Sequence, residues 1–111
     1  MVKRDQPVTE QDLEQLSSLF RLLSDKTRLS ILLRLVEGER NVSTLCEELK
    51  LPQPTVSHHL GLLRMNNVVG NRRHGKQVFY VLHGATGPNN GTVMEFSVLN
   101  LLVHVKPRVN S

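Results

Sequence analysis

The spacing of apolar residues changes once along this chain, and that change limits the possible folds more than any other feature. Before Asn66 and Asn67, apolar residues recur every three or four positions, which is typical of amphipathic helices. After them come two short runs, Val68–Arg73 and Gln77–Leu82, separated by the tripeptide His-Gly-Lys. The order predicts a group of helices followed by a β-hairpin with a short, glycine-containing tip.

Local capping signals predict where the first two helices begin and end. Thr9 can accept a hydrogen bond at a helix N-terminus, and Asp12, three residues later, completes an imperfect capping box. The apolar spacing that follows predicts a helix of about four turns. Ser24 or Asp25 is expected to cap a second helix that ends near Gly38.

Two further helices are predicted before the hairpin. A short third helix is expected to start at Asn41 or Ser43. Pro54 is tolerated only in the first turn of a helix, so it marks the start of a fourth helix that runs to about Asn66.

The segment 92–105 holds nine apolar residues in fourteen. Taken as a last helix, it would be apolar around most of its circumference and would need cover on several sides. A chain of 111 residues is one domain and is too small to surround that helix alone. The sequence therefore predicts a homodimer, with residues 9–105 as the folded domain. Residues 1–8, 84–91 and 106–111 are expected to be flexible.

Composition restricts the compartment. No run of eighteen apolar residues is present, and the polar N-terminus lacks the apolar core of a signal peptide, so we expect a cytoplasmic protein without a membrane span. Cys46 is the single cysteine, which excludes an internal disulfide and fits a reducing compartment.

The acidic residues are distributed unevenly. Residues 1–48 carry nine Asp and Glu against seven Lys and Arg, whereas residues 49–94 contain no acid at all. The basic residues of that second segment are Lys50, Arg64, Arg72, Arg73 and Lys76. A surface that faces a phosphate backbone needs this pattern, because a carboxylate there would repel the nucleic acid.

The element order and the charge pattern together indicate a DNA-binding fold. A short helix, a tight connection and a helix with a polar face form a helix-turn-helix, whose second helix enters the major groove. The hairpin, with Arg72, Arg73 and Lys76 near its tip, would be a wing that contacts the flanking backbone. The predicted class is therefore a mainly α winged helix-turn-helix with the order α-α-α-α-β-β-α.

The stretch LSDKTRLSILLRL…NVSTLCEELKLPQPTVSHHLGLLR…VVGNRRHGKQVFYVL resembles the ArsR/SmtB family of winged-helix repressors over residues 16–82. The resemblance implies a homodimer joined through the first and last helices. It also implies binding to double-stranded operator DNA and release when an effector binds.

The resemblance also implies which residues contact DNA. The positions that match base and phosphate contacts are Gln53, Thr55, Ser57, His58 and His59, with a basic residue at Arg64. Glutamine can pair with adenine, hydroxyls serve bases or phosphates, and arginine neutralises phosphate. Pro52 departs from the family, which commonly has a small polar cap there, and this proline is expected to stiffen the turn or to shift the helix start.

The residues do not favour the family's metal sites. Asn41 and Ser43 stand where paired thiolates would be, and Cys46 alone cannot build a site for a soft metal. Glu95 and His104 are nine residues apart, on different turns of the expected last helix. We therefore predict that the protein binds no metal ion and no cofactor, and that its effector is an unidentified molecule. A zinc or nickel site built from His83, His104 or Glu95 is the alternative.

No arrangement of residues supports catalysis: phosphate-binding glycine loops and metalloprotease motifs are absent from the sequence. Two alternatives to an effector-released repressor stay open. One is a winged-helix module that binds proteins without recognising an operator. The other is a repressor that responds to oxidation or alkylation of Cys46.

Overall fold

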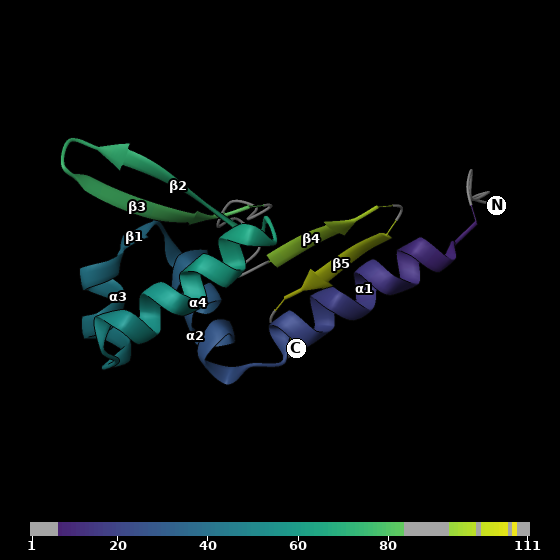
Figure 1. Cartoon of the computed structure of the whole chain (residues 1–111), viewed down its shortest axis with the longest axis horizontal. Helices are drawn as coiled ribbons and strands as arrows, with labels where there is room; N and C mark the ends of the chain where they lie inside the picture. Colours follow the sequence, from purple (N-terminus) through teal and green to yellow (C-terminus); the bar gives the residue numbers. More distant parts are fainter. Residues whose placement is uncertain (1–6, 84–93, 100, 107, 109–111) are drawn as a thin grey trace.

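The computed structural model describes residues 7–83, 94–99, 101–106 and 108, and shows helices followed by two β-hairpins (Figure 1). The helices are α1 (Glu10–Leu23), α2 (Lys26–Glu37), α3 (Val42–Leu49) and α4 (Gln53–Met65). The strands are β1 (Arg40–Asn41), β2 (Val69–His74), β3 (Gln77–Leu82), β4 (Met94–Val98) and β5 (Leu101–Val105). The segments 1–8, 84–91 and 106–111 lie wholly or mostly outside the described residues.

The predicted helix starts are confirmed by their caps. The Thr9 hydroxyl accepts a hydrogen bond from the Asp12 N–H at 3.1 Å, and the Asp12 carboxylate accepts one from the Thr9 N–H at 2.8 Å. This reciprocal pair is a complete capping box. Asp25, not Ser24, caps α2, and Asn41 caps α3. Each cap satisfies a backbone N–H that the helix leaves without a partner.

The wing forms as predicted and gains one short strand. Strands β2 and β3 pair in antiparallel register from Val69↔Leu82 to His74↔Gln77, and Gly75 at the tip adopts a φ of 64°, which favours glycine. The two-residue strand β1 pairs with the other edge of β3, giving the order β1-β3-β2. A strand this short carries no periodicity, so the sequence did not predict it.

The predicted last helix is wrong, because the described part of 92–105 forms the β4–β5 hairpin. Met94, Phe96 and Val98 are buried at every second position, while Glu95 and Ser97 alternate with them. This two-residue period is that of a strand with one buried face. The number of apolar residues in the segment 92–105 suggested a helix, but it does not reveal the alternation of buried and less buried residues along β4. Four valines in the segment 92–105 also favour strand.

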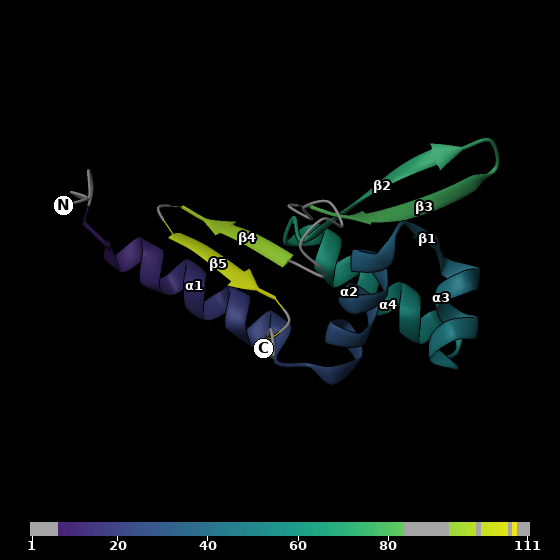
Figure 2. The ribbon, with the colours of Figure 1, turned by 180° about the vertical axis from the view of Figure 1, so that it is seen from behind.

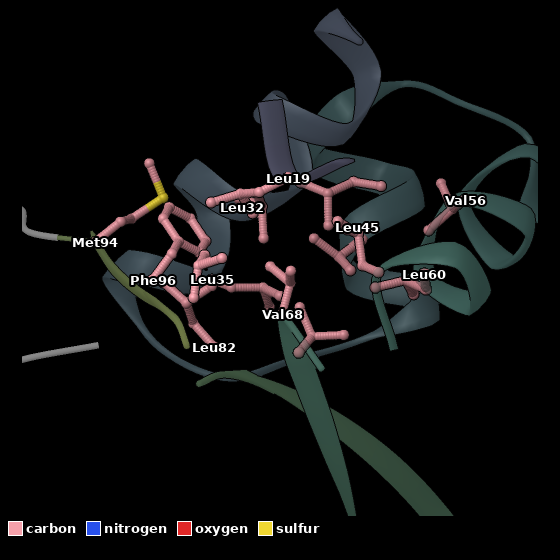
Figure 3. Packing of buried hydrophobic residues seen from close by; sticks show 14 residues of the cluster. Leu19, Leu32, Leu35, Leu45, Val56, Leu60, Val68, Leu82, Met94 and Phe96 are labelled. Atoms are coloured by element: carbon pink, nitrogen blue, oxygen red, sulfur yellow. The ribbon is translucent and has the colours of Figure 1, made fainter. Parts of the chain in front are cut away.

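One apolar core joins the two ends of the molecule. Figure 3 shows Val56 and Leu60 of α4 at one end of the cluster and Met94 and Phe96 of β4 at the other, with Leu32 between them. Both ribbon views place α1 and the β4–β5 hairpin side by side, away from α3 and the wing tip (Figures 1 and 2). Within the described residues, no helix is both long and apolar enough to cross a membrane.

Candidate nucleic-acid interface

The connection between α3 and α4 is three residues long. Lys50 ends α3 in the left-handed conformation, with a φ of 56°, and its N–H donates to the Cys46 carbonyl. Pro52 then takes the N-cap position of α4, and its carbonyl accepts hydrogen bonds from the N–H groups of Thr55 and Val56. Helix α4 therefore starts at Gln53 without a side-chain cap, which is the effect of the proline that departs from the family pattern.

Helix α4 separates an apolar face from a polar one. Val56, Leu60 and Leu63 are fully buried against the core. Gln53, Ser57 and Arg64 are exposed and fall on one stripe, because they are four and then seven residues apart. His58 is exposed beside this stripe. These four predicted contact residues are thus presented together on the surface of one helix.

Gly61 lies in the same exposed stripe, between Ser57 and Arg64 on the helix surface, and was not singled out from the sequence. Apart from its chain neighbours and the adjacent backbone of α4, a Cβ built at this glycine meets no described atom within 4 Å. Glycine inside a helix costs about 1 kcal/mol relative to alanine. Packing within the described chain does not explain this cost, and the glycine leaves the exposed stripe without a side chain between Ser57 and Arg64. A glycine interrupting a helical pattern is the signal that could have found it.

Thr55 and His59 are half-buried, unlike the other predicted contacts on α4. The His59 side chain is 15% exposed, and its Nδ1 lies 3.8 Å from the carboxylate of Asp25, the cap of α2. The pKa of Asp25 is lowered chiefly by its hydrogen bond from the Arg28 N–H, with smaller contributions from the charges of Arg28 and His59. His59 thus packs α4 against the start of α2, and its contact with DNA stays a prediction.

The two arginines of the wing, Arg72 and Arg73, leave opposite faces of β2 and differ in their partners. Arg72 donates two hydrogen bonds, of 2.8 and 2.7 Å, to the two carboxylate oxygens of Glu39. This pair lowers the pKa of Glu39 and raises the pKa of Arg72, in each case mainly through the side-chain hydrogen bonds. Arg73 is the next residue of the strand, so its side chain leaves the opposite face. Arg73 and Lys76 are exposed and make no ion pair with the described residues.

The residues considered for metal binding have other partners. Asn41 caps α3, and Cys46 is half-buried against the core. Glu95 and His104 face each other across the β4–β5 hairpin, with Oε1 and Nε2 3.7 Å apart, so the expectation that they lie on different helical turns is wrong. Among the described residues, no three His, Cys, Asp or Glu side chains gather in a way that would hold a metal ion.

Comparison with known proteins agrees with this geometry. The family described as "Bacterial regulatory protein, arsR family" matches residues 25–69, which include α3 and α4. The biofilm growth-associated repressor of Xylella fastidiosa is 39% identical over 79 residues, covering 68% of this chain and 69% of that protein. The chain belongs to the ArsR family. It is therefore a DNA-binding transcriptional regulator and not an enzyme, and the predicted winged-helix fold is confirmed.

One further relative and one solved structure show how far the likeness of this ArsR-family protein extends. The arsenical resistance operon repressor of Escherichia coli is 48% identical over 65 residues, which is 58% of this chain and 56% of that protein. The crystal structure of the transcriptional repressor BigR from Xylella fastidiosa superposes with a TM-score of 0.61 and 40% identity. That match covers 66% of this chain and 74% of the BigR chain.

Proposed function

We propose that this ArsR-family protein is a homodimeric repressor that binds an inverted-repeat operator and leaves it when an effector binds. Two α4 helices would enter successive major grooves, with Gln53, Ser57 and Arg64 facing the bases and phosphates. The two wings would hold the flanking backbone through Arg73 and Lys76. The observation that carries the proposal is the exposed polar stripe of α4, within a segment that contains no carboxylate. Operator binding would place the protein in the cytoplasm.

The dimer surface is proposed on α1 and the β4–β5 hairpin, in place of the first and last helices expected from the sequence. Leu13 and Phe20 of α1 are 53% and 52% exposed, and Leu102 of β5 is 55% exposed. The Cα radius of gyration is 15.6 Å, against about 13 Å for a compact domain of this length. Large exposed apolar side chains on an extended end of the molecule are typical of a surface that a second copy covers.

A charge introduced on this surface tests the dimer. We expect Phe20→Glu to give a monomer in sedimentation-equilibrium experiments, because a carboxylate would be buried without a partner. Leu33→Glu is the matched control, since Leu33 is 49% exposed on α2, outside the proposed surface. Equal self-association of both variants would refute this placement of the interface.

Selection of bound duplexes from a random DNA pool tests the function as a whole. We expect an inverted repeat whose half-sites lie about one helical turn apart. We also expect affinity to fall with salt, because cations on the protein displace counterions from phosphates. If no consensus emerges and the salt slope is near zero, the fold serves as a protein-interaction module. The response of Cys46 to alkylation is tested separately, by comparing DNA binding before and after treatment.

A further inference from the structure

A cavity of about 360 Å³ lies between α1, the C-terminal end of α4, the base of the wing and β4. Cavities of this size accommodate small organic molecules in other proteins. Residues of four separate segments of the chain line it. Its location was not evident from the sequence, because the β4–β5 hairpin was expected to be a helix.

The cavity wall combines apolar and polar groups. Leu19 and Leu22 of α1 and Phe96 and Val98 of β4 provide apolar contact surface. His83, at the end of β3, provides an imidazole.

The His83 ring is held in place on two sides. Its Nδ1 lies 3.0 Å from the Asn67 carbonyl oxygen, which accepts the ring N–H when that nitrogen is protonated. The ring also packs over Gly70, where a built Cβ would overlap Nε2. The base of the wing and the end of α4 are therefore fixed to each other at the cavity wall.

Charge decides which molecules the cavity favours. Glu95 is the carboxylate among the lining residues, and within the part of the chain that the structure describes no lysine or arginine lines the cavity. His104, 3.7 Å from Glu95, offsets the negative charge only when protonated. An organic cation would therefore gain from Glu95, whereas an anion would be repelled.

We propose that this cavity binds a small organic cation, an ammonium group on an apolar body, and that this ligand is the effector that lowers DNA affinity. The effector part rests on the proposed repressor function. The cavity contacts Asn66 and Asn67 at the end of α4 together with α1 and β4 of the proposed dimer surface. A bound molecule thus touches both the DNA-facing elements and the elements that set the spacing of the two α4 helices.

Titration calorimetry with the full chain tests the binding site. The probes are naphthylmethylamine, naphthylmethanol and naphthoate, used at about pH 8, where histidine side chains are ordinarily neutral, in buffer containing EDTA to exclude binding through a metal. We expect the amine to bind at least about tenfold more tightly than the alcohol, and the carboxylate to bind most weakly. Equal affinity for the three probes, or tightest binding of naphthoate, would overturn the assignment.

Variants of lining residues sharpen the test. Glu95→Gln should weaken binding of the amine by about tenfold and leave the affinity for the alcohol unchanged. The control Glu14→Gln, on the exposed surface of α1, should change neither affinity. Ser18→Phe should fill the cavity and remove binding of both probes, with an unchanged circular dichroism spectrum. Undiminished amine binding by Glu95→Gln would refute the role of the carboxylate.

The regulatory part is measured on the selected operator. Saturating amine should weaken DNA binding by wild-type protein by about tenfold, within the usual range of coupling between sites, and should not affect Ser18→Phe. Unchanged DNA affinity with the amine bound would overturn the effector role. If the ligand-free protein binds no DNA, the repressor proposal fails instead, and the calorimetry still decides the cavity.

Discussion

The ion pair between Arg72 and Glu39 predicts that the two neighbouring wing arginines differ in their effect on DNA binding. Each phosphate that a cation neutralises contributes about 0.9 to the slope of log K against log salt. Arg73 is free among the described residues, so Arg73→Ala should remove one contact per wing and flatten the slope of the dimer by about 1.8. Over a fourfold change in salt, from about 50 to 200 mM, that difference changes the relative affinity about twelvefold.

Arg72 is already neutralised by two hydrogen bonds of 2.8 and 2.7 Å to Glu39. Arg72→Ala should therefore change the slope by less than about half a unit, and Glu39→Gln should steepen it by freeing Arg72. Glu14→Gln makes the same change in net charge without releasing an arginine and serves as the control. Fluorescence anisotropy on the selected operator over a salt series measures all four variants. If Arg72→Ala flattens the slope as much as Arg73→Ala, the ion pair opens on DNA and the reasoning fails.

Three further predictions concern α4, the β4–β5 hairpin and the carboxylates of Asp25 and Glu39. Gly61→Ala should raise the free energy of unfolding in urea by about 0.5–1 kcal/mol, and Gly61→Trp should fold but lose operator binding; retained binding would show that this stripe does not face DNA. In a monomeric background, Phe96→Ala should lower the free energy of unfolding by about 3–5 kcal/mol, and Leu102→Ala should lower it much less. A similar decrease for both variants would contradict the burial of β4. The pKa values of Asp25 and Glu39 are lowered in the folded chain, so their stabilising effect is complete above the ordinary values of 3.8 and 4.5 and is lost as pH falls through the lowered ones. The difference in the free energy of unfolding between wild type and Glu39→Gln, measured by urea titration, should accordingly disappear only at acid pH. If this difference already disappears near neutral pH, the assignment of the lowered pKa to Glu39 is refuted.

The sequence by itself determined the elements whose signals are local. The capping box at Thr9, the caps at Asp25 and Asn41 and Pro54 in the first turn of α4 each act within a few residues, so the helix starts were predicted correctly. The wing followed from a change of period and a glycine at the tip. The candidate contact residues on α4 came from the resemblance of this segment to the ArsR/SmtB family, and the structure exposes Gln53, Ser57, His58 and Arg64 among them.

The tertiary structure decided everything that depends on partners distant in the chain. The local sequence of an apolar segment such as 92–105 is compatible with either a helix or a strand. Its burial against the core selects the β4–β5 hairpin. Arg72 and Glu39 are 33 residues apart, and His59 meets Asp25 only because α4 packs on α2. The cavity beside Glu95 likewise exists only once four elements meet. These contacts follow from long-range packing, on which residue spacing along the sequence carries no information.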